Sequence, residues 1–300
     1  MYKYYFGLSE LPFTLTPNTH FFLNMPTHQE ALNLILVALE NSEGFVKIVG
    51  EVGTGKTLLC RKVLNSLDEN CISAYIPNPY LNPDEFRMSF ALELGVDVQM
   101  LKGSFDLLER INQRLVERVA EGKRVVLVVD EAQAMPEKTL EALRLLTNLE
   151  TETTKLFQVL LFGQPELDQL LRQHSLRQLR QRITFSYRLQ ALDSEATGQY
   201  LHHRLTLAGY TGATLFNRKA INLLWEAAAG TPRLINILAH KAMMVAYGKG
   251  EHQITPAHIK RAVEDTDGVQ LKSSAVTGGI AAVCLVALTI AAWLVLGGGL

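Results

Sequence analysis

The feature that most constrains this chain of 300 residues is a glycine-rich run that joins an apolar segment to an amphipathic one. The run covers residues 50–57 and reads GEVGTGKT, and the largely apolar run FVKIV at residues 45–49 precedes it. Its glycines let the main chain fold back after a strand, so that successive N–H groups point toward one anion. This spacing between a strand and a helix is typical of a phosphate-binding loop. The run therefore predicts a site for the phosphates of a nucleotide.

The loop and the helix after it are both expected to bind that nucleotide. We expect the helix to direct its unpaired N–H groups and the positive end of its dipole at the phosphates. Lys56 would reach the β- and γ-phosphates, and Thr57 would hold Mg²⁺. A glycine-rich turn without a ligand is the alternative, which the flanking strand and helix patterns disfavour. The predicted nucleotide-binding residues are Gly50, Glu51, Val52, Gly53, Thr54, Gly55, Lys56, Thr57 and Leu58.

Two acidic residues follow a second apolar run, at residues 125–129. Successive apolar and β-branched residues predict a strand buried on both faces, and such strands present functional residues at their carboxyl ends. Asp130 would position the hydration shell of Mg²⁺ together with Thr57, and Glu131 would polarise the attacking water. An acidic N-cap for a helix that begins near Pro136 is the alternative, and the two roles can coexist.

A third apolar run, at residues 157–163, predicts another buried strand that ends at Gln164. The amide of Gln164 could orient the same water. The alternating residues 183–189 predict an edge strand further along the chain.

An arginine block without acidic residues lies between these two strands and continues into the second: Arg172, Arg177, Arg180, Arg182 and Arg188. A solvated basic face is one interpretation of such a block. The other is an arginine finger, in which the guanidinium of one subunit stabilises charge on the γ-phosphate bound by its neighbour. Arg180 and Arg182 are the candidates because they come just before the predicted edge strand.

After Asp193, apolar residues recur at helical spacing, which predicts a second, smaller unit made of helices. The run Gly230-Thr231-Pro232 predicts the end of one helix and the start of the next. Arg233 then lies in a first helical turn, where a cation opposes the helix dipole. A bound phosphate would compensate for that cost, so Arg233 is a candidate nucleotide contact. A merely exposed arginine is the alternative.

In this order the motifs resemble those of the AAA+ ATPases, and within them the ExeA/GspA-type secretion ATPases. Among these the chain is most similar to the ATPases of the mannose-sensitive haemagglutinin (MSHA) type IV pilus system. The resemblance covers residues 1–267. It rests on the glycine-rich run at residues 50–57 and on the motif DEAQ at residues 130–133. Shorter segments also contribute, at residues 6–8, 12–13, 16–17, 162–167, 181–183 and 230–236.

The resemblance implies an α/β fold, a P-loop NTPase of the AAA+ type with a mostly parallel five-stranded sheet and a C-terminal helical lid. It implies ATP hydrolysis with ATP and Mg²⁺ as the bound groups. Gln164 takes the sensor-1 position, where the wider superfamily more often has Asn or Thr, and Arg233 takes the sensor-2 position. Arg182 or Arg180 takes the finger position. The candidate catalytic residues are thus Lys56, Glu131, Gln164, Arg180, Arg182 and Arg233.

The first 22 residues are rich in aromatic side chains: Tyr2, Tyr4, Tyr5, Phe6, Phe13, Phe21 and Phe22. Because such side chains carry large apolar areas, we expect most of them to pack this N-terminal segment onto the sheet. The resemblance implies that the segment also covers the adenine, with Thr16, Pro17 and His28 near it.

Residues 276–296 carry no charge. As a helix they would be about 32 Å long at 1.5 Å per residue, against a hydrocarbon core of about 30 Å. We therefore expect a single C-terminal transmembrane helix rather than a buried soluble one. ATP is cytosolic, so the predicted location is the bacterial inner membrane with the ATPase domain in the cytoplasm. The chain would end as a tail anchor, unless the sequence is truncated.

The predicted organisation is an α/β nucleotide-binding domain at 1–192, a helical lid at 193–268, a linker at 269–275 and the membrane span at 276–296. A formal net charge of −1 offers no basic field for nucleic acid. Cys60, Cys71 and Cys284 lack metal-ligand spacing and indicate a reducing compartment.

Together these features predict a membrane-anchored AAA+ ATPase that drives assembly or remodelling of a cell-envelope machine, a type IV (MSHA) pilus or a type II-like secretion apparatus. Its expected partners are further copies of itself, in a ring or nucleotide-dependent assembly, the inner membrane, and pilus or secretion proteins. A DNA-handling ATPase of the transposition-helper kind is one alternative. An ATP-gated scaffold with little turnover is the other.

Overall fold

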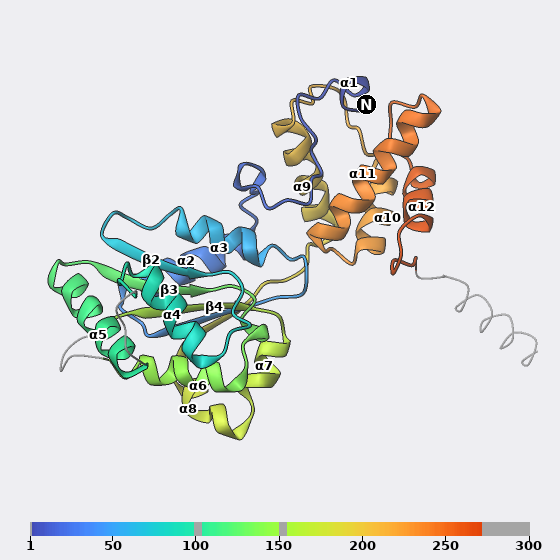
Figure 1. Ribbon diagram of the computed structural model, residues 1–300. Helices are drawn as coiled ribbons and strands as arrows, with labels where there is room; N and C mark the ends of the chain where they lie inside the picture. Colours follow the sequence, from blue (N-terminus) through green and yellow to red (C-terminus); the bar gives the residue numbers. More distant parts are fainter. Residues whose placement is uncertain (1, 99–103, 150–154, 272–300) are drawn as a thin grey trace, which may run out of the picture.

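A five-stranded sheet with helices on both faces forms the larger part of the molecule (Figure 1). A computed structural model of the chain describes residues 2–98, 104–149 and 155–271. In spatial order the strands are β2 (Cys71–Ile76), β3 (Arg124–Val129), β4 (Gln158–Gly163), β1 (Phe45–Val49) and β5 (Ile183–Arg188). Each neighbouring pair is parallel. The expected α/β fold with a mostly parallel five-stranded sheet is confirmed, as is the edge position of β5.

Alternation along the strands sends successive side chains to opposite faces of the sheet. In β3, Val126 and Val128 pack in one apolar cluster, which includes residues of α2 (Pro26–Glu40) and α3 (Lys56–Leu64). Leu127 packs in the other cluster, with helices from the opposite face. These helices are α4 (Pro83–Glu93), α5 (Ser104–Ala120), α6 (Glu137–Leu146), α7 (Glu166–Leu171) and α8 (Arg177–Arg182). Both faces of the sheet are therefore covered.

Parallel strands bring several predicted site residues to one edge of the sheet. Val49, the last residue of β1, pairs with Gly163, the last residue of β4. The N–H group of Gly50 donates to the carbonyl oxygen of Gly163 at 3.1 Å. Because β3 runs beside β4 in the same direction, the residues that follow these strands meet at the carboxyl edge.

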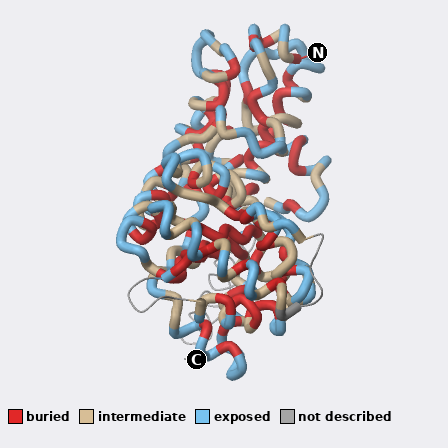
Figure 2. Tube along the Cα trace, turned by 60° about the vertical axis from the view of Figure 1, so that its left-hand side comes forward, coloured by how far each residue is buried: buried red, intermediate tan, exposed pale blue. Residues whose placement is uncertain are grey.

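Four longer helices form a unit of their own beside the sheet (Figure 1). They are α9 (Ser194–Leu207), α10 (Arg218–Ala228), α11 (Pro232–Lys249) and α12 (Pro256–Glu264). Figure 2 shows buried stretches both in this unit, which we call the lid, and along the strands of the sheet. The start of α11 matches the prediction, because Gly230 has a positive φ of 68°, Thr231 is the N-cap and Pro232 comes first in the helix.

Four of the seven N-terminal aromatic side chains are buried on the lid and not on the sheet, so the expectation that most of them pack on the sheet is wrong. Tyr2, Phe6, Phe13 and Phe21 are buried in the same apolar cluster as the lid helices. The Tyr2 hydroxyl forms a 2.7 Å hydrogen bond with Nδ1 of His240 in α11. The physical reason is that helices already cover both faces of the sheet, whereas the lid helices have no sheet of their own to pack against.

The remaining described elements are short: α1 (Tyr2–Tyr5), η1 (Thr19–Phe21), η2 (Ala132–Ala134) and η3 (His174–Leu176). Within the described ranges, no helix is both long enough and apolar enough to cross a bilayer. The predicted span at 276–296 and Cys284 lie outside the described residues.

Candidate active site

The glycine-rich run forms a loop between β1 and α3 at the carboxyl edge of the sheet. Gly53 and Gly55 have positive φ values of 81° and 99°, which favour glycine. Lys56 is the first residue of α3 and is buried, and its Nζ donates to the carbonyl oxygens of Gly50 at 2.8 Å and Glu51 at 3.0 Å. Burial lowers the pKa of Lys56, while nearby carboxylates, Glu131 foremost, act in the opposite direction.

The two residues predicted to serve the metal ion lie together. Asp130 follows β3 and is 3% exposed, and the Thr57 hydroxyl donates a hydrogen bond to its carboxylate. Burial raises the pKa of Asp130, and the hydrogen bonds from Thr57 and from the N–H group of Glu131 act against that rise. A hydroxyl and a carboxylate are oxygen ligands of the kind that Mg²⁺ takes beside waters and phosphates. The pair therefore fits Mg²⁺.

Glu131 and Gln164 are also neighbours, although 33 positions separate them in the chain. The Gln164 amide donates to Oε2 of Glu131 at 3.0 Å, and the Gln133 amide donates to the same oxygen at 2.6 Å. Burial alone would raise the pKa of Glu131, but these two hydrogen bonds and the charge of Lys56 bring it below its usual value. Glu131 is thus an ionised carboxylate held beside Gln164.

The lid meets the loop through Arg233. Its main-chain N–H group donates to the carbonyl oxygen of Gly53 at 3.3 Å. Arg233 is an exposed residue, and it also lines a cavity of about 370 Å³ between the loop and the lid. Lys56, Thr57, Glu131 and Gln164 line the same cavity, so most of the predicted residues converge there.

The N-terminal segment and the lid form the other walls of the cavity. Residues 14–18 of the N-terminal segment lie along it, which includes Thr16 and Pro17. His28 lies behind the loop instead, where its Nε2 donates to the carbonyl oxygen of Thr54 at 3.0 Å. Beside Arg233, four lid residues line the cavity, namely Tyr200, Arg204, Pro232 and Asn236.

Arg204 is the least expected of these lid residues because it is 5% exposed. Its guanidinium lies 4.5 Å from the centre of the Phe21 ring and donates to the Tyr200 hydroxyl at 3.1 Å and to the carbonyl oxygen of Pro12. No carboxylate of the described residues forms an ion pair with it. The signal in the sequence was an aromatic residue and an arginine four positions apart on one helix, a spacing that places them on the same face.

Comparisons with known proteins agree with this geometry. The family described as "AAA domain" matches residues 39–171. General secretion pathway protein A of Aeromonas hydrophila is 42% identical over 278 residues, which cover 90% of this chain and 49% of that protein. The chain thus carries an AAA domain, and it is an ATPase. The predicted enzyme class is confirmed, and the chain spans about half the length of this curated relative.

Solved structures show the same fold as this ATPase at low identity. The ORC2 protein of Aeropyrum pernix has a TM-score of 0.61 at 16% identity, over 86% of this chain and 74% of that one. Cdc6p of Pyrobaculum aerophilum has a TM-score of 0.64 at 17% identity, over 82% and 70% of the two chains. The RuvB branch migration motor of Thermotoga maritima has a TM-score of 0.53 at 16% identity, over 81% and 70%. A P-loop fold of this kind implies nucleotide binding.

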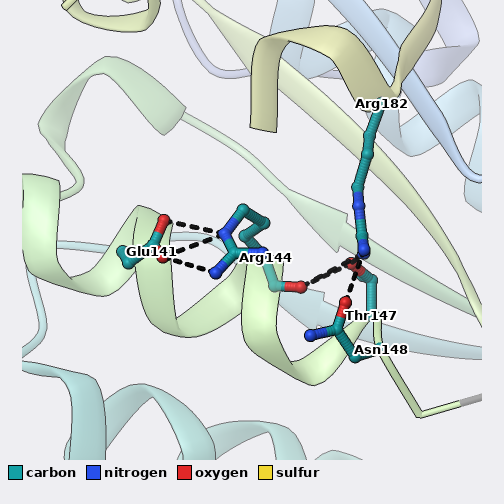
Figure 3. Close-up of polar contacts among 5 residues, drawn as sticks. All are labelled: Glu141, Arg144, Thr147, Asn148 and Arg182. Carbon is teal, nitrogen blue, oxygen red and sulfur yellow. Dashed lines mark hydrogen bonds and ion pairs between the residues drawn. The ribbon is translucent and has the colours of Figure 1, made fainter. Parts of the chain in front are cut away.

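The two arginine-finger candidates do not join the cavity of the ATPase. Arg182 directly precedes β5, and Ile183 of that strand pairs with Phe45 at the start of β1. Arg182 therefore lies at the amino edge of the sheet, opposite the edge that carries the loop. Its Nη1 donates to Oγ1 of Thr147 at 2.6 Å and to the carbonyl oxygen of Arg144 at 3.3 Å (Figure 3).

Arg182 thus binds the carboxyl end of α6, where carbonyl groups lack partners within the helix (Figure 3). Its Nη2 also donates to the side-chain oxygen of Asn148. Arg180 is exposed, and no polar contact of its side chain appears within the described part of the chain. The two candidates therefore differ: one is engaged in its own subunit and the other is accessible.

Proposed function

We propose that this ATPase hydrolyses ATP with Mg²⁺ and uses the associated lid movement to assemble or remodel a secretion machine or a type IV (MSHA) pilus at the bacterial inner membrane. The observation that carries the proposal is the cavity in which the phosphate-binding loop, Glu131 and the lid meet. The likeness to a general secretion pathway protein supports the secretion context.

In this proposal each side chain has a separate task. The loop N–H groups and Lys56 bind the phosphates, and Thr57 and Asp130 hold Mg²⁺, which neutralises charge on the phosphates when bound. Glu131 accepts a proton from the attacking water, which Gln164 helps to orient. Arg233 couples the presence or loss of the γ-phosphate to movement of the lid, because its main chain contacts Gly53 of the phosphate-binding loop.

The roles of Glu131 and Lys56 can be separated by two substitutions. Glu131→Gln removes the base and keeps the side-chain size, so turnover should fall by about 10²-fold or more while ATP still binds. Lys56→Ala should weaken ATP binding itself. Steady-state phosphate release and equilibrium binding of a fluorescent ATP analogue measure the two quantities. Wild-type protein that binds ATP without measurable turnover would favour the scaffold alternative.

We propose further that Arg180 acts as the finger toward a neighbouring subunit. Its exposure supports this assignment over Arg182, which already contacts α6. Arg180→Ala protein mixed with Lys56→Ala protein should regain part of the wild-type turnover, because mixed interfaces pair an intact arginine with an intact nucleotide site. Arg182→Ala in the same mixture is the matched comparison. No recovery at any ratio, with oligomers confirmed by mass photometry, would contradict the assignment.

The proposed membrane anchor is residues 276–296. Full-length protein should sediment with inner membranes and resist extraction by high salt, because an apolar segment of this length partitions into the bilayer. A chain that ends at residue 271 should lose this association and keep its ATP binding. We also propose that the lid unit, predicted at 193–268, includes residues 2–25, since their aromatic side chains pack in its core.

A further inference from the structure

The side chain of Gln133 connects two parts of the active site that are far apart in sequence. Its Nε2 donates to Oε2 of Glu131 at 2.6 Å, and its Oε1 accepts the main-chain N–H of Gln164 at 2.9 Å. Gln133 lies in η2, just after β3, whereas Gln164 directly follows β4. One amide therefore links the ends of two neighbouring strands.

We propose that Gln133 is a positioning residue, which fixes the carboxylate of Glu131 relative to Gln164 and thereby holds the general base in its productive geometry. This inference rests on the proposed role of Glu131 in activating water. Gln133 itself is absent from the lining of the cavity, so it acts through Glu131.

The backbone of Glu131 supports a positioning role. Glu131 has φ 52° and ψ 38°, a left-handed conformation that is unfavourable for a residue with a side chain. Such conformations persist at functional sites where the surroundings over-determine them. The side-chain amides of Gln133 and Gln164 both bind the carboxylate that this backbone turn presents.

The two hydrogen bonds also make the two oxygens of the Glu131 carboxylate inequivalent. Both hydrogen bonds end on Oε2, and no donor among the described residues contacts Oε1. Oε1 is thus the oxygen available to a water molecule in the cavity. A carboxylate held by one oxygen presents the other in a fixed direction, which is what a general base requires.

Only an amide side chain of this length can make both contacts, because one needs a donor and the other an acceptor. The site is also close-fitting: a Cβ on Gly163 would lie 3.3 Å from Oε1 of Gln133. Gln133→Met keeps the length and loses both hydrogen bonds. Gln133→Glu keeps the acceptor for Gln164 and places a second carboxylate against Glu131.

The experiment measures kcat and KM for ATP hydrolysis, together with the Kd of a non-hydrolysable ATP analogue. Gln133→Met should lower kcat by about tenfold or more, because a displacement of about 1 Å can cost about 10²-fold in rate. Gln133→Glu should lower it further. The Kd of the analogue should stay within about twofold of the wild-type value for both variants, since Gln133 does not line the cavity.

Gln158→Met is the matched control. Gln158 is a buried glutamine in β4 whose Nε2 donates to the carbonyl oxygens of Glu43 at 3.0 Å and Ala38 at 3.3 Å, at the opposite edge of the sheet. This variant loses hydrogen bonds of the same kind without touching Glu131. It should lower the melting temperature and leave kcat of the folded protein unchanged.

The outcomes separate the inference from the proposed function. Wild-type kcat in Gln133→Met, or an equal loss of kcat in Gln158→Met, would overturn the positioning role. A parallel loss of kcat and analogue binding would overturn it too, because that result indicates a general loosening of the site. Unchanged turnover in Glu131→Gln would instead refute the role of Glu131 in the proposed function.

Discussion

The main-chain N–H group of Arg233 donates to the carbonyl oxygen of Gly53, so the first turn of the lid helix α11 rests on the phosphate-binding loop. A Cβ built on Gly53 would lie 2.6 Å from Cβ of Arg233 and 3.0 Å from Cγ2 of Thr231. Glycine at this position therefore serves two purposes. It adopts a positive φ and it lets the lid approach the loop.

Gly53→Ala should undock the lid. The left-handed backbone costs about 1–2 kcal/mol with a side chain, and the contact with Arg233 forces the lid to shift as well. We expect faster limited proteolysis between the sheet and the lid in the absence of nucleotide, which separates lid docking from phosphate binding. Gly122→Ala is the control because Gly122 has φ 74° and open space around it. Equal proteolysis of the two variants would contradict the contact.

Phe6→Ala should destabilise the lid by about 3–5 kcal/mol, as expected when a large aromatic side chain is removed from a core. Phe6 is 6% exposed and packs with the lid helices, whereas Tyr4, two residues before it, is 80% exposed. Tyr4→Ala should change the free energy of unfolding by less than about 0.5 kcal/mol. Chemical denaturation followed by circular dichroism compares the two. Similar losses would argue against burial of the N-terminal segment in the lid.

Arg182→Ala should cost about 1–2 kcal/mol of stability, because it removes charged hydrogen bonds from the end of α6. Arg188→Ala serves as the comparison: Arg188 is exposed on the edge strand β5, and its loss should have an effect below about 0.5 kcal/mol. Thermal unfolding of both variants without nucleotide tests the difference. If Arg182→Ala unfolds at the wild-type temperature, its contacts with Thr147 and Arg144 contribute nothing to the fold.

Local patterns in the sequence were sufficient to predict the loop and four of the five strands, β2 being the exception. Residues 125–129 are uniformly apolar because β3 is buried on both faces, and the glycines of the loop are required by their own φ values. The start of α11 was equally local, since Pro232 and Thr231 act within one helical turn. Features of this kind depend on neighbours in the chain and can be derived without the rest of the structure.

The features that the sequence analysis missed or predicted wrongly depend on contacts between segments that are far apart in the chain. Gln133 and Gln164 are 31 positions apart, and neither residue alone indicates a shared hydrogen bond. The N-terminal aromatic residues could pack on an apolar face of the sheet or on the lid. They pack on the lid because other helices cover both faces of the sheet. The apolar character of a side chain in the sequence indicates that it will be buried, but it does not indicate which segment it will pack against.

The buried imidazole of His28 makes the stability of the protein depend on pH. Burial lowers the pKa of His28, and the hydrogen bond to the carbonyl oxygen of Thr54 acts in the opposite direction. With Nε2 as the donor in that bond, protonation would have to occur at Nδ1, which is buried and has no partner within the described residues. The folded protein therefore resists a proton that the unfolded chain accepts near pH 6.5.

The sign of this effect follows from the direction of the shift. Above pH 6.5 both states hold a neutral ring and there is no penalty, whereas below it the unfolded state binds a proton first and stability falls as the pH drops toward the folded pKa. His28→Gln removes the titration, so the loss of melting temperature between pH 7.5 and pH 5.5 should be smaller than in the wild-type protein. Melting curves without nucleotide at the two pH values measure it. The same loss in both proteins would show that His28 does not set the acid limit of stability.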